Sequence, residues 1–348
     1  MRLGMIVDYS GGFEETADLL LDYEAAGLQL AAVAEAYSFD AVSQLGYLAA
    51  KSQTIEICSA ILQVYSRTPA LLAMTAAGLD YVSGGRFTLG IGASGPQVVE
   101  GFHGVPYDAP LGRTRETIEI CRKVWRREAL SFEGKHYTIP LPADQGTGLG
   151  KSLKLINHPV RDRIPISVAA LGPANVAMTA ELADSWQPLF FHPTQHRAAW
   201  GDALDKGLAK RDPALGVLDI MLQVSFAVGE PDDETLAPIR KQLALYIGGM
   251  GAREKNFYNQ LACRYGYESE AAEIQDLYLA GRKDDAANAV PDELVRAVSL
   301  VGTEDDLARQ VQEFRAAGVT TFLLNPLADT AEARVKDVAT LAHITSSP

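Results

Sequence analysis

The chain has 348 residues, of which 47% are apolar and 22% are charged, an ordinary composition for a soluble globular protein. Its 31 basic and 44 acidic residues give a net charge of −13, which argues against nucleic-acid binding and against an anionic membrane surface. Three distant cysteines, Cys58, Cys121 and Cys263, argue against a disulfide framework and a cysteine-based zinc site. We expect a cytoplasmic enzyme or small-molecule binder without signal peptide or membrane span.

Short apolar runs alternate with helical patterns along the chain. Leu3–Asp8 is a continuous apolar run, the pattern of a fully buried parallel strand. Residues 13–24 then follow helical spacing up to Gly27, a residue suited to closing a helix. Seven further strands are predicted at Leu28–Ala34, Ile55–Ile61, Phe87–Gly92, Ile164–Ala170, Ser185–Phe191, Ile220–Val228 and Val319–Leu324. Helices are predicted at Asp40–Ala50, Pro69–Val82, Arg113–Arg127, Ala174–Ala183, Gln195–Lys210 and Thr235–Tyr246.

Eight buried strands alternating with helices predict an α/β fold, a closed (β/α)₈ TIM barrel. A doubly wound open sheet is the structural alternative. Residues 131–163, with a candidate hairpin, and residues 248–298, which are helical and charged, interrupt the alternation. We expect both segments to be insertions at the C-terminal rim of the strands, where barrel active sites lie. The prediction is therefore one domain over residues 1–348.

Two strands end in small residues. Gly90-Ile91-Gly92-Ala93-Ser94-Gly95 matches G-x-G-x-x-G, but Pro96 and later glycines interrupt the long helix that a dinucleotide fingerprint requires. Such an exit, made of small residues directly after a strand, lets backbone N–H groups approach an anion, so this segment could bind a phosphate. It could equally be a tight turn that binds no ligand. Ala169-Ala170-Leu171-Gly172-Pro173 is a second exit, where Pro173 suits the first position of a helix whose free amides could hold a phosphate.

Candidate catalytic side chains follow the strands. Glu35 and Tyr37 end the second strand, and His103 follows the glycine turn, so all three are placed where barrel enzymes carry catalytic groups. Rim packing for Tyr37, and a loop hydrogen bond for His103, are the structural alternatives. The segment between His192 and His196 contains no glutamate, which the zinc-binding motif of a hydrolase would have there, so both histidines are interpreted as structural or surface residues. No metal site and no nucleophilic triad is predicted.

At this point the residues resemble a known family. Ser83-Gly84-Gly85-Arg86-Phe87 running into Leu89-Gly90-Ile91-Gly92 resembles the fourth-strand signature of the bacterial luciferase-like flavin and deazaflavin oxidoreductases. The continuation from Ala93 to Tyr107 is similar to the branch that uses coenzyme F420. Ser59–Tyr65, with Arg67-Thr68-Pro69, resembles that branch's third strand and loop. The similarity covers nearly the whole chain and is weakest in the two insertions.

The resemblance implies a (β/α)₈ barrel and coenzyme F420, with FMN as the alternative cofactor. It also implies a homodimer and a small-molecule substrate such as an alcohol, aldehyde, enone or imine. Hydride would be transferred at the deazaflavin C5, with the ring over the third strand. Members carry a non-proline cis peptide there, and Ser59–Ala60 is the candidate by position. A monooxygenase using FMN and a non-catalytic deazaflavin-binding protein are the alternatives.

The site residues follow from the same resemblance. Relatives have Asp-His after the second strand, where this chain has Ala36-Tyr37, so Glu35, Tyr37 and His103 are the candidates for proton transfer. The cofactor-binding candidates are Ser59, Ala60, Ile61, Leu62, Gln63, Gly92, Ala93, Ser94, Gly95, Gln97, Val98, Ala169, Ala170, Leu171, Gly172 and Pro173. Arg67 and Arg113 are further candidates for binding the phosphate of the cofactor.

Overall fold

A computed structural model describes residues 1–7, 12–251 and 253–346, and within them eight parallel strands close into a barrel. They are β1 (Arg2–Val7), β2 (Leu30–Val33), β3 (Glu56–Ser59), β5 (Phe87–Gly92), β8 (Ile166–Ala169), β9 (Ser185–Gln187), β10 (Asp219–Val228) and β12 (Thr321–Pro326). Pairing of β1 with β12 and of β9 with β10 completes the ring. The eight predicted strands are confirmed, although Asp8 lies outside the described residues.

The barrel has an apolar interior, as the continuous apolar runs require. Its inner cluster contains Leu30, Ala32, Cys58, Met221 and Leu323, each at most 1% exposed. A larger apolar layer lies between the strands and the surrounding helices. Burial on both faces explains why these strands are uniformly apolar in sequence rather than alternating.

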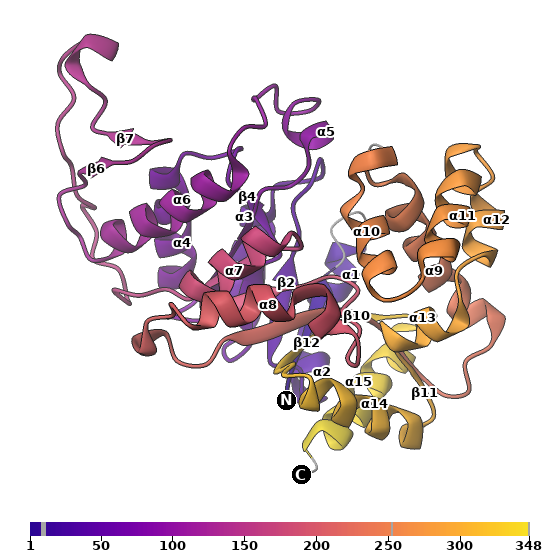
Figure 1. The fold of residues 1–348 in the computed structure, drawn as a ribbon. Helices are drawn as coiled ribbons and strands as arrows, with labels where there is room; N and C mark the ends of the chain where they lie inside the picture. Colours follow the sequence, from indigo (N-terminus) through magenta and orange to yellow (C-terminus); the bar gives the residue numbers. More distant parts are fainter. Residues whose placement is uncertain (8–11, 252, 347–348) are drawn as a thin grey trace.

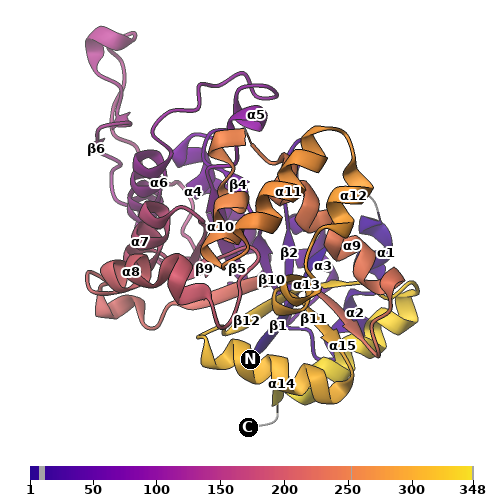
Figure 2. The same ribbon diagram turned by 45° about the vertical axis from the view of Figure 1, so that its right-hand side comes forward.

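The helices surround the strands (Figures 1 and 2). They are α1 (Phe13–Asp18), α2 (Leu20–Ala25), α3 (Ala41–Lys51), α4 (Pro69–Val82), α6 (Pro110–Trp125), α7 (Pro173–Leu182), α8 (His196–Leu208), α14 (Glu304–Ala316) and α15 (Ala331–Ser346). The helix predicted over 13–24 is divided at Leu19, whose ψ of 0° leaves the helical range. The start of α4 follows its sequence signal, because the Thr68 hydroxyl accepts the Leu71 N–H at 3.2 Å and Pro69 takes the first position.

The second insertion lies at the C-terminal side of the barrel, as expected. The connection after β10 first forms α9 (Asp233–Ala244), the helix predicted over Thr235–Tyr246, and a π-helical turn (Leu245–Gly249). The predicted segment 248–298 then contains α10 (Phe257–Arg264), α11 (Glu268–Leu279), α12 (Lys283–Asn288) and α13 (Asp292–Ala297). The short strand β11 (Leu300–Gly302) then pairs with the C-terminal part of β10. Asn256, which precedes α10, holds that helix against the π-helical turn, because its side chain donates to the carbonyls of Tyr246 and Ile247 at 2.8 and 2.9 Å.

The first insertion contains the predicted hairpin, formed by β6 (Phe132–Glu133) and β7 (Thr138–Ile139). This segment joins α6 to β8 and runs back along α6, so that the Tyr137 ring lies 5.4 Å from the guanidinium of Arg113 in the first turn of that helix. The hairpin therefore reaches the side of the barrel on which the loop after β5 lies, and it projects from the barrel (Figure 1). Its turn is held by Glu116 of α6, whose carboxylate accepts the N–H groups of Lys135, His136 and Tyr137 at 2.8 to 3.2 Å.

The described residues also form short 3₁₀ turns in the connections between these elements, at Ala143–Gln145, Pro213–Leu215 and Arg253–Lys255.

Candidate active site

The two small-residue exits lie side by side at the C-terminal ends of β5 and β8. Gly92 closes β5, and a Cβ placed on it would lie 3.1 Å from the Ile61 side chain and 3.5 Å from the Ala169 Cβ. The prediction of two neighbouring exits is therefore matched by the geometry. A side chain at Gly92 would intrude between three segments that meet at this rim.

The cis peptide lies between Ala60 and Ile61, one bond later than the position predicted at Ser59–Ala60. Ser59 still belongs to β3, opposite Val33, and the Ala60 N–H donates to the Val33 carbonyl at 2.7 Å. The Ser59–Ala60 peptide thus completes the strand ladder. The Ser59 hydroxyl both donates to the Gly90 carbonyl and accepts the Gly90 N–H at 2.8 Å, so this buried side chain forms part of the barrel wall.

Ile61 leads into a two-residue strand that the sequence analysis did not separate from β3. This strand, β4 (Leu62–Gln63), pairs with the end of β5, so that Gln63 lies opposite Gly92. Leu62 and Gln63 are both fully buried. The Gln63 amide nitrogen donates to the Ala36 carbonyl at 3.3 Å, while its Oε1 is buried without a hydrogen-bond partner. A buried acceptor without a donor costs free energy, and it suits an N–H group of a ligand.

The loop after β5 contains only a four-residue helix, α5 (Pro96–Val99). The sequence conclusion that these glycines do not open a dinucleotide-binding helix is therefore confirmed. Ser94 has a φ of 57°, and its carbonyl accepts the Tyr107 hydroxyl at 3.3 Å, which fixes the turn. Ser94 and Gln97 are exposed, whereas the predicted ligands Ala93, Gly95 and Val98 are half-buried.

The exit of β8 leads directly into α7, with Gly172 as its N-cap and Pro173 at its first position. No side chain caps this end, so the first-turn amides are available to an anion. Two indoles hold the exit, since Trp186 donates to the Ala170 carbonyl and Trp200 to the Leu171 carbonyl, each at 2.8 Å. The helix end is therefore fixed in place and open.

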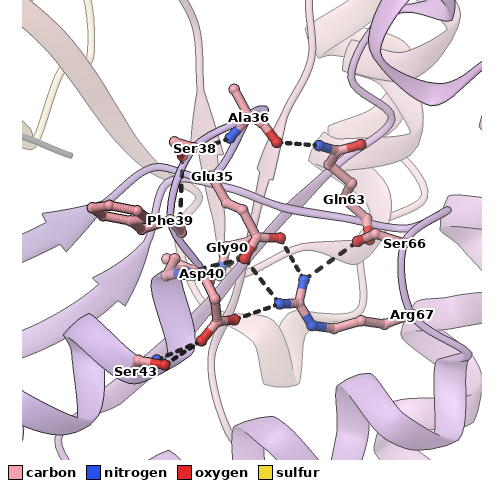
Figure 3. A network of polar contacts seen from close by, with 12 residues as sticks. Glu35, Ala36, Ser38, Phe39, Asp40, Ser43, Gln63, Ser66, Arg67 and Gly90 are labelled. Carbon is pink, nitrogen blue, oxygen red and sulfur yellow. Dashed lines mark hydrogen bonds and ion pairs between the residues drawn. The ribbon is translucent and has the colours of Figure 1, made fainter. Parts of the chain in front are cut away.

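Glu35 lies in an ionic network between the loop after β2 and the loop after β4 (Figure 3). The guanidinium of Arg67 contacts both Glu35 carboxylate oxygens at 2.5 and 2.9 Å, and also contacts Asp40 at 3.0 Å. Hydrogen bonding to Glu35 raises the pKa of Arg67. Burial raises the pKa of Asp40, but hydrogen bonds from Ser43 and the charge of Arg67 outweigh it, so the net pKa is lowered.

The two arginines predicted as phosphate ligands are both paired with carboxylates. Besides the contacts of Arg67, Arg113 reaches both carboxylate oxygens of Asp108 at 3.1 and 3.0 Å. The buried Tyr65 donates its hydroxyl to the Asp108 carbonyl at 2.6 Å. Tyr65 and Arg113 thus brace the loop after β5 at Asp108, whereas Arg67 ties the loop after β4 to the loop after β2.

Tyr37 and His103 come together through a third aromatic residue. Tyr37 is 71% exposed and Phe102 is 66% exposed, and their ring centres are 6.3 Å apart. The His103 ring lies 5.2 Å from Phe102, and its Nε2 is buried without a hydrogen-bond partner. The structure therefore brings the loops after β2 and β5 into contact and leaves one imidazole nitrogen unpaired there.

His192 and His196 have structural surroundings, as interpreted from the sequence. The His196 Nδ1 lies 2.8 Å from the Pro193 carbonyl, and the His192 ring lies 5.4 Å from that of Tyr265. Burial lowers the pKa of both histidines. In the part of the chain that the structure describes, no cluster of His, Cys, Asp or Glu could hold a metal ion, and no helix is long and apolar enough to cross a membrane.

Two residues of this rim were not predicted. Asp40 joins the Arg67 network and also caps α3, with its carboxylate accepting the Ser43 N–H at 2.8 Å. Its position directly before a helical pattern is the signal that could have identified the cap. Phe102 stands in the pattern between Gly101 and His103, but only the fold shows that it meets Tyr37.

The sequence matches the family described as luciferase-like monooxygenase over residues 1–321. A protein of Mycobacterium tuberculosis, Rv3520c, provisionally named a coenzyme F420-dependent oxidoreductase, is 41% identical over 98% of this chain and 99% of its own length. The 5,10-methylenetetrahydromethanopterin reductase of Archaeoglobus fulgidus is 28% identical over 80% of this chain and 79% of its own.

Solved structures support the same fold. The F420-dependent tetrahydromethanopterin reductase of Methanopyrus kandleri superimposes with a TM-score of 0.80 at 19% identity, covering 98% of this chain and 97% of that one. An F420-dependent secondary alcohol dehydrogenase, solved with an F420–acetone adduct, gives 0.77 at 14% identity and covers 99% of both chains.

Proposed function

Because this chain belongs to the luciferase-like monooxygenase family, we propose that it is an F420-dependent oxidoreductase that transfers a hydride between the deazaflavin C5 and a small organic substrate. The observation that carries the proposal is its 41% identity, over nearly the full length of both chains, to a protein provisionally named for this cofactor. The substrate class is an alcohol, aldehyde, enone or imine, since these are small molecules that give or accept a hydride.

The residues at the rim fit such a cofactor. The Gly92 position offers an approach that a Cβ would fill, and the unpaired Oε1 of Gln63 suits an N–H of a flat heteroaromatic ring. The uncapped start of α7 at Gly172 and Pro173 suits a phosphate. We assign the binding surface to Ala60–Gln63, to Gly92–Gly95 with Gln97 and Val98, and to Ala169–Pro173, with Ser59 as the wall behind it.

The bound deazaflavin supplies hydride chemistry, and the protein orients the reactants and handles the proton. We assign proton transfer to His103, because its buried Nε2 lacks a partner in the described structure. Tyr37, which is exposed and lies against Phe102, is assigned to covering the substrate entrance. Glu35 is assigned a positioning role, because Arg67 contacts both of its carboxylate oxygens.

Titration of the purified protein with F420 and, separately, with FMN tests the cofactor. We expect F420 fluorescence to change saturably and FMN to bind weakly or not at all. Tight FMN binding without F420 binding would support the FMN-dependent monooxygenase instead.

A panel of enones, imines, aldehydes and ketones, offered with reduced F420, tests catalysis. Oxidation of the reduced cofactor by at least one class supports the enzyme. Binding without turnover across the whole panel supports the non-catalytic deazaflavin-binding protein.

We also propose that the chain forms a homodimer through α4. The side chains that α4 leaves exposed are apolar, and its one charged residue, Asp80, is buried. The exposed apolar side chains of α4 are Leu71, Met74, Tyr81 and Val82. Large exposed apolar groups gathered on one helix are typical of a protein interface.

Light scattering after gel filtration tests the dimer, with an expected mass of twice the 37.4 kDa chain. Replacing Leu71 and Met74 by Asp should yield the monomer. Val217→Asp is the control, because Val217 is apolar and, at 89%, more exposed than Leu71 at 45% or Met74 at 54%, but lies outside α4. We further propose that residues 1–348 form one unit acting in the cytoplasm, where its three free thiols would stay reduced.

A further inference from the structure

The ionic network of Arg67, Glu35 and Asp40 at the C-terminal rim has its charges paired within the protein, so direct ligand binding does not explain it. Arg67, Glu35 and Asp40 form a cluster of one guanidinium and two carboxylates at the start of α3 (Figure 3). The Arg67 side chain is 14% exposed and that of Glu35 is 9% exposed. Water therefore screens this pair little, and the loss of either partner leaves a charge in a largely buried place.

We propose that Arg67, through Glu35 and Asp40, is a positioning residue that holds segment 35–40 against β4 and so fixes the Gln63 amide where the cofactor binds. This inference deepens the proposed function and rests on it. We name the three side chains the Arg67 clamp.

The carboxylate of Glu35 is already occupied by donors. Besides the two bonds from Arg67, its Oε2 accepts the Ala41 N–H at 3.1 Å, which ties it to the first turn of α3. Three donors of the protein therefore engage this one carboxylate, and its oxygens are turned toward Arg67 and α3 rather than toward a substrate. Glu35 thus serves the clamp rather than the proton transfer for which its position in sequence made it a candidate.

The clamp and Gln63 join the same two segments of chain. Glu35 directly precedes Ala36, whose carbonyl accepts the Gln63 amide at 3.3 Å. On the other side, Ser66 precedes Arg67, accepts a bond from it at 3.3 Å and donates to the Gln63 carbonyl at 3.2 Å. Releasing Arg67 would therefore free Ala36, and Gln63 would lose the partner that orients its unpaired Oε1.

The position of Tyr37 depends on the same segment. Tyr37 follows Ala36 directly, and its ring reaches Phe102 on the loop after β5. Movement of segment 35–40 would separate these rings as well. The clamp thus supports both the cofactor-facing amide and the aromatic pair at the entrance.

Three variants and a control test the clamp. Arg67→Met removes the guanidinium, Arg67→Lys restores one charge, and Glu35→Gln keeps the shape without the charge. Arg115→Met is the matched control, because it breaks the bidentate Arg115–Glu181 pair, at 3.1 and 2.8 Å, between α6 and α7. Each protein is titrated with F420 by fluorescence, and its thermal unfolding and amide hydrogen exchange are measured without ligand.

For Arg67→Met we expect about tenfold weaker F420 binding, equivalent to about 1.4 kcal/mol. We also expect faster exchange of the Ala41 and Ser43 amides. Arg67→Lys should recover part of the affinity, and Glu35→Gln should weaken it. Arg115→Met should lower only the unfolding temperature, which separates positioning from general stability.

Two results would overturn the clamp while leaving the proposed function intact. One is wild-type F420 affinity in folded Arg67→Met or in Glu35→Gln. The other is an equal loss of affinity in Arg115→Met. If the wild-type protein itself does not bind F420, the proposed function fails, and unchanged exchange at Ala41 and Ser43 in Arg67→Met then refutes the clamp independently.

Discussion

The two ends of the barrel differ in how their polar groups are satisfied. At the N-terminal end lies a cavity of about 250 Å³, lined by Arg2, Arg86 and Arg161 together with acidic residues. Arg2 contacts Glu56 at 2.8 Å and Asp219 at 2.7 Å, and Arg161 pairs with Asp80. Arg86 donates to four backbone carbonyls. Each of these three guanidinium groups therefore has partners within the chain.

At the C-terminal end, a small gap of about 10 Å³ lies beside Phe190 and Gln223, between the strands and α9. Yet Gln63 and His103 each carry a buried polar atom without a partner, and Tyr37 and Phe102 stand exposed. The cavity of about 250 Å³ thus lies among side chains that are paired within the chain, whereas the C-terminal rim carries the unpaired polar atoms of Gln63 and His103, which suit a ligand.

Gly92→Val, at the C-terminal end, should cause the largest loss of F420 affinity. The added side chain would press on Ile61 and Ala169, which lie within 3.5 Å of the new Cβ, and would block the backbone approach. We expect F420 affinity to fall at least about 100-fold, or about 2.7 kcal/mol, in a titration by fluorescence. Gly46→Val in α3 is the control, because a Cβ there meets nothing within 4 Å. Unchanged affinity with intact circular dichroism would remove Gly92 from the site.

Arg161→Met attacks the N-terminal end. It leaves the carboxylate of Asp80, whose side chain is 1% exposed, without its ion pair. The loss of one partner of a buried pair costs about 3 kcal/mol, so the unfolding temperature should fall by at least about 5 °C. F420 affinity should remain within about threefold of wild type. A large loss of affinity in the folded variant would contradict the assignment of this end to stability.

Gln63→Leu should have the opposite effects to Arg161→Met, namely weaker F420 binding with little change in stability. It removes a buried acceptor that lacks a partner, together with one long hydrogen bond to Ala36. We expect the free energy of unfolding to change by less than about 1 kcal/mol, because these two losses offset each other. F420 affinity should fall about tenfold, since a ligand N–H would then be buried unpaired. Calorimetry and titration of the same sample measure both quantities.

Acid should weaken the fold modestly through His192 and His196. Burial lowers the pKa of both in the folded protein, so the neutral form is favoured there. As the pH falls below about 6.5, the unfolded chain binds protons that the folded chain resists, and stability is lost. The unfolding temperature should be lower at pH 5.5 than at pH 7.5, with a smaller difference in His192→Gln. An equal difference in that variant would contradict the assignment.

The barrel itself could be predicted because its strands are buried on both faces. Leu30–Val33, for example, is buried at every position, so its apolar run is unbroken. The strand β4 was missed because two residues carry no period, and the cis bond was misplaced by one residue because hydrogen bonding of Ala60 to Val33 is not visible in sequence.

The candidate site was predictable only in part. Small residues identified the exits at Gly92 and Ala169, since a close approach of strands requires them. The pairing of Glu35 with Arg67 joins residues 32 positions apart, so the sequence placed Glu35 correctly at the rim without revealing that its carboxylate was occupied. The hairpin could be predicted, but not its attachment to Glu116 of α6, because that contact joins residues far apart in the sequence.

A crystal structure of the protein with F420 tests the central claim most directly. We predict the deazaflavin at the C-terminal ends of β3, β4 and β5, with Gln63 and the backbone of Gly92 against the ring. Binding of the cofactor in the cavity around Arg2 and Arg161, or no binding to crystals or in solution, would contradict this account.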